Sequence, residues 1–155
     1  MRITYEHRFA APLDVVVAMM GDEGFGAIRA RASGAANSDV LIDHDPDGSF
    51  TVVMRRSVPA TAIPPEFRAF VGSEHNGDPT DREGTFALEI PGTPGHARGA
   101  VVLRPDGDGT TFGLAGDVYA PVPIVGAVVE RAIASAIEQA LPAELAAADA
   151  WLAAT

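Results

Sequence analysis

The stretch that decides the fold is residues 124–153, IVGAVVERAIASAIEQALPAELAAADAWLA. Apolar residues recur along it at steps of three and four, which is the spacing of one face of an α-helix. This stripe runs from Val125 through Ile133 and Ile137 to Trp151. We therefore predict one long amphipathic helix, whose apolar face must be buried against another element of the fold.

Pro142 lies inside this predicted helix. A proline in a helix interior removes one hydrogen bond and clashes with the preceding turn, at a cost of about 3 kcal/mol. The apolar stripe nevertheless resumes in register at Leu145. We expect the helix to bend or to be interrupted near Gln139 and then to continue to Trp151.

Most of the remaining chain has the pattern of β-strands. Residues 1–9 alternate between polar and apolar side chains, as a half-buried strand does. Two short helices are predicted next, over residues 13–20 and 24–32. Five or six antiparallel strands should follow, and their clearest segments are residues 40–44, 50–58, 85–90, 97–103 and 111–120.

Turn residues separate several of these strands. Asp45-Pro46-Asp47-Gly48 and residues 105–109, PDGDG, are typical of hairpin turns. Residues 59–84 are less regular, because prolines at 59, 64 and 65 are incompatible with a continuous central strand. We interpret residues 66–71 as a possible single helical turn, and any strand within residues 73–84 should be short.

These elements predict an α+β fold in which a curved antiparallel sheet wraps around the long C-terminal helix. The length of 155 residues suits a single domain, residues 1–155. The sequence has no cysteine, which excludes disulfides, thiolate catalysis and zinc sites built on sulfur.

The charge and the apolar segments bear on partners and location. The formal net charge of −10 argues against binding to nucleic acid or to an anionic membrane surface. The longest apolar stretch, residues 118–129, is too short and too rich in proline for stable membrane insertion. Residues 1–9 lack the apolar core of a signal peptide, so we expect a cytoplasmic protein.

The run at residues 118–126, VYAPVPIVG, resembles the signature of a bacterial family, domain-of-unknown-function family 2505. That family belongs to the START-like superfamily, also called SRPBCC or birch-pollen-allergen-like. Further matching positions are Glu130, residues 141–143 (LPA), residues 150–152 (AWL), and the loop at 92–95 followed by Gly99. The resemblance implies the helix-grip fold and a bacterial source.

Two segments depart from the family pattern. Residues 73–84 are short and lack the tryptophan found in relatives, so the fourth strand is expected to be stunted. Ala127 and Val128 replace the second glycine and the lysine of the signature. The family has no established catalytic residues, so the resemblance assigns none here.

No metal site or cofactor is expected. The four histidines lie in four separate segments, without the spacing of a helical ligand pair. The loop at residues 43–54 imitates the start of a calcium-binding loop, but Met54 stands where a glutamate is needed. His7 lies between Tyr5 and Phe9 on the apolar face of the first strand, either as a hydrogen-bonded structural residue or as a polar group inside a cavity.

The residues expected to point inward, alternate ones on the strands and those of the apolar stripe on the helix, predict a largely apolar lining for a ligand cavity. Tyr5 and His7 would be its polar groups. Small residues expected to face this space are Ala100, Gly116, Ala132, Ala136 and Ala140. The predicted ligand-binding residues are Tyr5, His7, Phe9, Val52, Met54, Phe86, Leu88, Val102, Phe112, Leu114, Val125, Val129, Ile133 and Ile137.

Three functions fit these expectations. The first is a non-enzymatic protein that binds or carries a small hydrophobic molecule, such as a lipid or a polyketide-like compound. The second, implied by the superfamily resemblance, is a cyclase- or dehydratase-type enzyme in which His7 or an inward arginine of the Arg55-Arg56 pair assists proton transfer. The third is an interaction module with a fully packed core. The sequence does not indicate an oligomeric state.

Overall fold

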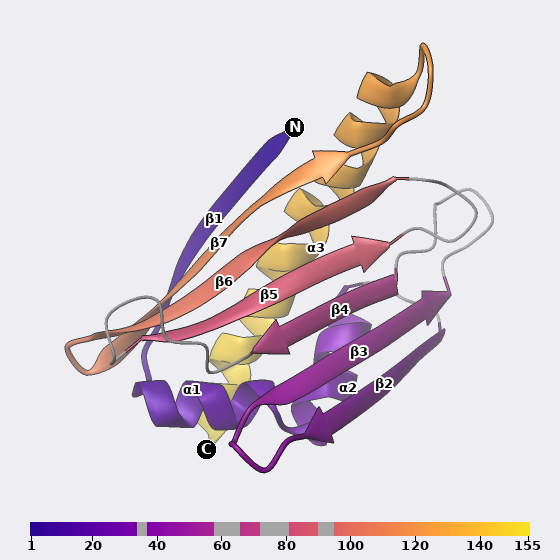
Figure 1. Ribbon diagram of the computed structural model, residues 1–155. Helices are drawn as coiled ribbons and strands as arrows, with labels where there is room; N and C mark the ends of the chain where they lie inside the picture. Colours follow the sequence, from indigo (N-terminus) through magenta and orange to yellow (C-terminus); the bar gives the residue numbers. More distant parts are fainter. Residues whose placement is uncertain (34–36, 58–65, 72–80, 90–94) are drawn as a thin grey trace.

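The computed structural model describes residues 1–33, 37–57, 66–71, 81–89 and 95–155, and at residues 37–39, 54–57, 66–71 and 89 the description is confined to the backbone. The elements follow the chain in the order β1 (Arg2–Phe9), α1 (Leu13–Met20), α2 (Glu23–Ala32), β2 (Asn37–His44), β3 (Phe50–Ser57), β4 (Glu66–Val71), β5 (Arg82–Glu89), β6 (His96–Asp106), β7 (Gly109–Tyr119) and α3 (Gly126–Ala154) (Figure 1).

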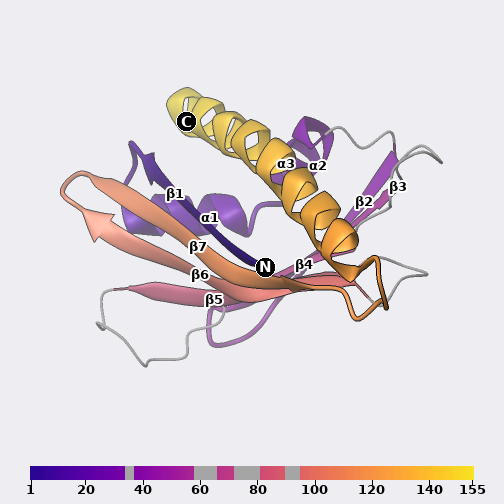
Figure 2. The same cartoon turned by 90° about the horizontal axis from the view of Figure 1, so that it is seen from above.

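The seven strands form one antiparallel sheet in the order β1-β7-β6-β5-β4-β3-β2. Helix α3 lies across one face of this curved sheet (Figure 2). We call this face the inner face and the opposite one the outer face. The predicted architecture, a curved antiparallel sheet holding a long C-terminal helix, is therefore confirmed.

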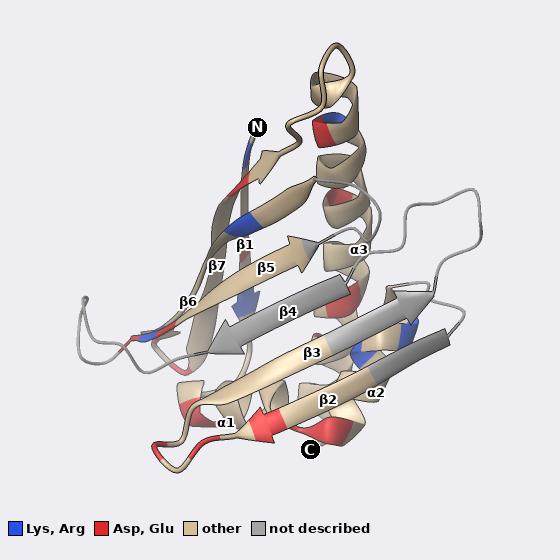
Figure 3. Ribbon diagram, turned by 45° about the vertical axis from the view of Figure 1, so that its right-hand side comes forward, with Lys and Arg blue, Asp and Glu red and all other residues tan. Residues whose placement is uncertain are grey.

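Both predicted hairpin turns contain a glycine with a positive φ. Gly48 has a φ of 87° between β2 and β3, and Gly107 has a φ of 62° between β6 and β7. Residues with a side chain rarely adopt this conformation, which explains why glycine marks these turns in the sequence. The β2–β3 turn is also rich in acidic residues (Figure 3).

The core lies between the inner face of the sheet and the three helices. Helix α3 contributes its buried residues Ile133, Leu141, Leu145 and Ala148. Residues from the sheet and from α1 and α2 complete this cluster, among them Phe9, Val16, Phe25, Leu103, Phe112 and Val118. The Phe25 and Trp151 rings lie 5.8 Å apart and join α2 to the end of α3.

The expected helical turn at residues 66–71 is wrong, because Glu66–Val71 forms strand β4. This strand pairs with β3 on one side and with β5 on the other. Prolines 64 and 65 precede the strand, so they remove no hydrogen bond from within it. Strand β5 also begins at Arg82, earlier than the predicted start at residue 85.

Helix α3 continues through Pro142 to Ala154, as expected, and of the two expected outcomes near Gln139 the interruption does not occur. The bend stays a prediction. The proline deprives the Glu138 carbonyl of its helical donor. Glu138 and Pro142 are both exposed, so water can replace that donor. Burial of Leu141 and Leu145 on the other side of the helix offsets the remaining cost. Within the described residues, no helix combines the length and the apolar character needed to cross a membrane.

Candidate functional site

A cavity of about 60 Å³ lies between the inner face of the sheet and α3. Its described lining combines residues of β5, β7 and α3, namely Phe86, Leu88, Leu114, Ala136, Ile137, Ala140, Leu141 and Glu144. On the helix side, Ala136 and Ala140 end in single methyl groups and therefore leave space opposite the sheet. Among these described lining residues, the other side chains are apolar and Glu144 alone is polar.

Two glycines determine where the Phe86 ring lies. Gly99 and Gly116 face each other across β6 and β7, and Phe86 of β5 pairs with Gly99. A Cβ atom at Gly99 would lie 2.8 Å from Phe86 Cε1, and one at Gly116 would lie 2.7 Å from Phe86 Cζ. The ring therefore packs directly against bare backbone, which lets it form part of the cavity wall.

Glu144 is a buried carboxylate, with a relative exposure of 6% for the whole residue. Arg29 Nε of α2 donates a hydrogen bond to Glu144 Oε2 at 2.7 Å, and the two side chains are 13% and 8% exposed. The pair joins α2 to α3 beside the cavity. Burial of one such charge without its partner would be strongly unfavourable.

Sequence reasoning did not identify Glu144, although a signal for it exists. It lies three residues after Leu141 and four before Ala148, both of which are buried on the apolar stripe of α3. A glutamate on that stripe must be paired or hydrogen-bonded when the helix packs. A charged residue within the apolar stripe could therefore have predicted that Glu144 is buried and paired.

His7 is tied to the helix. Its Nε2 lies 3.1 Å from Asp149 Oδ1 and 3.0 Å from Asp149 Oδ2, and its side chain is 24% exposed. Its ring also contacts the edge of Phe9, with centroids 4.8 Å apart. His7 is not among the described lining of the cavity, and the hydrogen bond to Asp149 joins β1 to the last part of α3.

The structure distributes the predicted ligand-binding residues over several environments. Phe86, Leu88, Leu114 and Ile137 line the cavity. Phe9, Phe112 and Ile133 are buried in the core, and Tyr5 and Val129 pack against it. Val52 belongs to a separate small cluster with Ala30 and Phe50, and Val125 is 46% exposed at the start of α3. The side chain of Met54 lies outside the described residues, as do those of Arg55 and Arg56, one of which was expected to point inward.

Val102 faces outward, contrary to the predicted parity. Its neighbour Leu103 is 2% exposed and pairs with Phe112 on the inner face, whereas Val102 pairs with Gly113. Residues 100–103 are all apolar, so they carry no alternation from which the inner face could be chosen. Ala100 lies on the outer face with Val102, and Ala132 is exposed on α3, so neither contributes space to the cavity.

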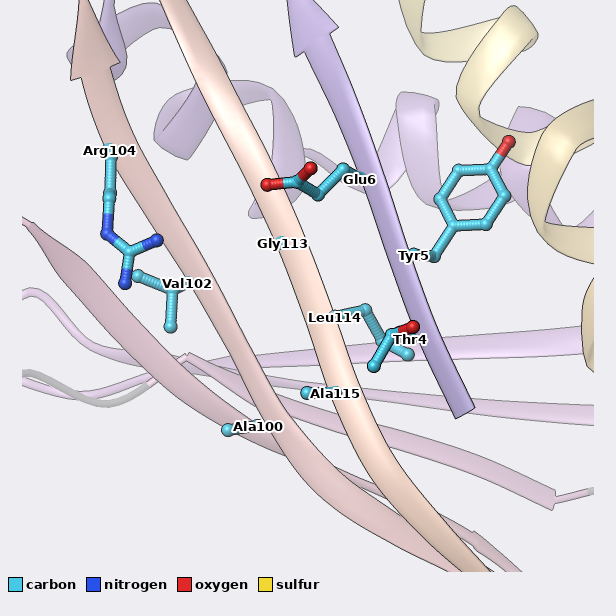
Figure 4. Close-up of a pocket in the computed structure, with 9 residues that line it drawn as sticks. All are labelled: Thr4, Tyr5, Glu6, Ala100, Val102, Arg104, Gly113, Leu114 and Ala115. Carbon is cyan, nitrogen blue, oxygen red and sulfur yellow. The ribbon is translucent and has the colours of Figure 1, made fainter. Parts of the chain in front are cut away.

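The outer face has a hollow of its own, of about 440 Å³, over β1, β7 and β6 (Figure 4). Ala100, Gly113 and Ala115 form its floor, and Tyr5 points away from it toward α3 (Figure 4). Thr4, Glu6 and Arg104 at its border are exposed. This larger hollow opens to solvent and its bordering residues are exposed, so the inner cavity is the better candidate for a binding site.

The curved antiparallel sheet and the long C-terminal helix define a helix-grip fold. A structure from Thermus thermophilus, TTHA0849, has a TM-score of 0.65 at 14% identity and covers 100% of both chains. The Zhui aromatase/cyclase from Streptomyces sp. R1128 has a TM-score of 0.62 at 17% identity, over 95% of this chain and 90% of that one. A START superfamily protein from Mycobacterium smegmatis has a TM-score of 0.57 at 16% identity, over 92% of each chain.

Residues 4–152 match the family model described as "Protein of unknown function (DUF2505)". The chain therefore belongs to this family, as the run at residues 118–126 indicated. No curated protein matches the chain significantly. The similar structures share too few identical residues to indicate more than the fold.

Proposed function

We propose that this protein binds a small hydrophobic molecule between the inner face of its sheet and α3. The observation that carries the proposal is the cavity walled by Phe86, Leu88 and Leu114 on the sheet and by Ala136 and Ala140 on the helix. A concave and mostly apolar space with few polar groups is characteristic of small-molecule sites. The likeness of the fold to a START superfamily protein and to an aromatase/cyclase supports the same proposal.

The size of the cavity limits the ligand that it can hold without rearrangement. Sites for drug-sized ligands usually have volumes of about 300–1,000 Å³, whereas this cavity measures about 60 Å³. A compact ring or a short chain is therefore the ligand closest to its size. Binding of a lipid or a polyketide-like molecule would require α3 to move away from β5 and β7.

A second candidate is an enzyme of the cyclase or dehydratase type. The observation that favours it is the His7–Asp149 pair, because a carboxylate that orients an imidazole is a common element of proton transfer. Its weakness is that neither His7 nor Asp149 belongs to the described lining of the cavity, whose titratable residue is Glu144. Binding without catalysis requires fewer functional side chains than an enzyme does, so it ranks first of the three functions. The third, an interaction module with a packed core, would leave the cavity without a role.

The test is binding of fluorobenzene, a single neutral ring closer to the size of the cavity, to the purified protein, with fluorine NMR of this probe as the readout. We expect saturable binding by the wild type and a loss of affinity of at least tenfold in Ala140→Leu, because leucine fills the cavity from the helix side. Ala140 suits this test better than Ala136, since Ala136 is exposed and a large side chain there can turn toward solvent.

The matched control is Ala146→Leu, an identical change at an exposed position of the same helix. It should bind the probe as the wild type does, and thermal unfolding should show that both variants are folded. Absence of saturable binding to the wild type, or equal affinities in the two variants, would exclude the cavity as the binding site.

A further inference from the structure

We infer that Glu144 makes the cavity selective for the charge of its ligand, so that it accepts neutral molecules carrying a hydrogen-bond donor and rejects carboxylates. This inference rests on the proposed function and specifies its ligand class. It excludes free fatty acids and other organic anions. It favours compact phenols, alcohols and similar neutral molecules.

The position of the two charges carries the inference. Glu144 lines the cavity, whereas Arg29, which donates to it at 2.7 Å, is not among the described lining residues. The negative member of the pair thus belongs to the cavity lining, and the positive member approaches it from α2. Within the described lining there is no lysine or arginine that could neutralise an anionic ligand.

Because Glu144 is buried, its charge acts strongly on a ligand in the cavity. The Glu144 side chain is 8% exposed, so water screens its charge poorly. An anion entering the cavity would lose its hydration and would lie close to a like charge, and both effects oppose binding. A hydroxyl group pointing toward Glu144 would instead donate a charge-assisted hydrogen bond, which is stronger than one between neutral groups.

The same geometry orients the ligand. The carboxylate lies on α3, while Phe86, Leu88 and Leu114 form the apolar wall on the sheet. A neutral ring with one hydroxyl group can place that group toward Glu144 and its apolar body against these three side chains. Polar and apolar ends are thereby matched to separate parts of the cavity.

The experiment compares three ligands of one shape as competitors of fluorobenzene at pH 7.5. They are ethylbenzene, which is apolar, 4-ethylphenol, which is a neutral hydrogen-bond donor, and 4-ethylbenzoate, which is an anion. With the wild type we expect 4-ethylphenol to displace the probe at a concentration at least tenfold below that needed with 4-ethylbenzoate. Equal competition by phenol and benzoate would overturn the inference while leaving the proposed function intact.

The decisive variant is Glu144→Gln, which removes the negative charge and leaves the guanidinium of Arg29 beside the cavity. Its preference for phenol over benzoate should fall at least tenfold or reverse. A preference set only by the general insolubility of anions in apolar sites would not change. The control Glu138→Gln, at an exposed position of the same helix, should keep the wild-type preference.

If Glu144→Gln does not fold, the double variant Arg29→Gln/Glu144→Gln replaces it in the experiment. This variant removes both charges together, so neither is left buried without the other. Its preference for phenol should fall at least threefold, and an unchanged preference would overturn the inference. Failure of the wild type to bind the probe would overturn the proposed function and, with it, this inference.

Discussion

The backbone N–H of Ala120 donates a hydrogen bond to Glu130 Oε1 at 3.2 Å, which joins the end of β7 to α3. The other carboxylate oxygen of Glu130 lies 3.6 Å from the N-terminal amino group, at the start of β1. One side chain thus fixes the entry of the helix relative to two neighbouring strands.

Glu130→Ala should lower the free energy of unfolding by about 1–3 kcal/mol, because a part-buried backbone donor loses its charged acceptor. Urea denaturation followed by circular dichroism measures this change. Glu138→Ala, at an exposed helix position, should stay within about 0.5 kcal/mol of the wild type. Equal effects of the two substitutions would mean that the Glu130 contacts do not stabilise the fold.

The Arg29–Glu144 pair should behave as a buried unit. Arg29→Leu or Glu144→Leu alone should cost about 3–5 kcal/mol, because each leaves the opposite charge buried without its 2.7 Å partner. The double variant Arg29→Leu/Glu144→Leu should be much closer to the wild type. A double-mutant cycle in urea checks this, and additive losses would show that the two residues are not coupled.

Gly116 should tolerate no side chain, whereas Gly113 on the same strand should. A Cβ atom at Gly116 would lie 2.6 Å from the Arg98 carbonyl oxygen and 2.7 Å from Phe86, but at Gly113 the nearest atom is 3.9 Å away. Gly116→Ala should lower the free energy of unfolding by at least about 2 kcal/mol. Gly113→Ala should be neutral or slightly stabilising. Chemical denaturation of both variants measures the contrast, and similar losses would contradict it.

Ile124 is the described non-glycine residue with a positive φ, 71°, and its side chain is fully exposed. A β-branched residue in this conformation is strained by about 1–3 kcal/mol. Ile124→Gly should therefore raise the free energy of unfolding by about 0.5–1 kcal/mol, despite the greater entropy of the unfolded chain. Val128→Gly, at an exposed helix position, should instead cost roughly 0.5 kcal/mol, the difference between the helix propensities of valine and glycine. Thermal and urea unfolding distinguish these opposite signs.

The pKa of Asp47 is lowered, first by a hydrogen bond from the Ser49 hydroxyl and then by one from the Ser49 backbone N–H. A carboxyl group whose pKa is depressed in the folded state contributes stability above its unfolded pKa and loses it as the pH falls through the folded value. Ser49→Ala should raise the pKa of Asp47 toward its ordinary value. An NMR titration of the carboxyl carbon measures this, and an unchanged pKa would show that the hydroxyl has no effect.

Local patterns predicted most of the fold because each was nearly unambiguous. The stripe from Val125 to Trp151 identified α3, and the glycine-containing turns identified two hairpins. Strand β4 was misjudged because a six-residue strand beside prolines carries little pattern of its own, and its pairing with β3 and β5 supplies the stability. Such tertiary pairing is not encoded in a short window of sequence.

The site was less accessible to sequence reasoning. The expected inward positions on the strands and on α3 include six residues of the described lining, Ala136 and Ala140 among them. The expectation failed at Val102, where four consecutive apolar residues conceal the alternation. The partnership of Arg29 and Glu144 joins residues 115 positions apart. Only the packing of α2 against α3 brings them together, so neither residue alone indicates a charged wall in the cavity.

The pairing of β1 with β7 determines when the sheet can be completed during synthesis. Arg2 lies opposite Asp117, so the first strand has no partner until more than a hundred further residues have left the ribosome. The helix that covers the inner face follows later still. Contacts so distant along the chain form slowly, because a long loop must close before they contribute stability. The nascent chain therefore carries an uncovered apolar face throughout most of its translation, which is the stage at which assistance by chaperones would matter most.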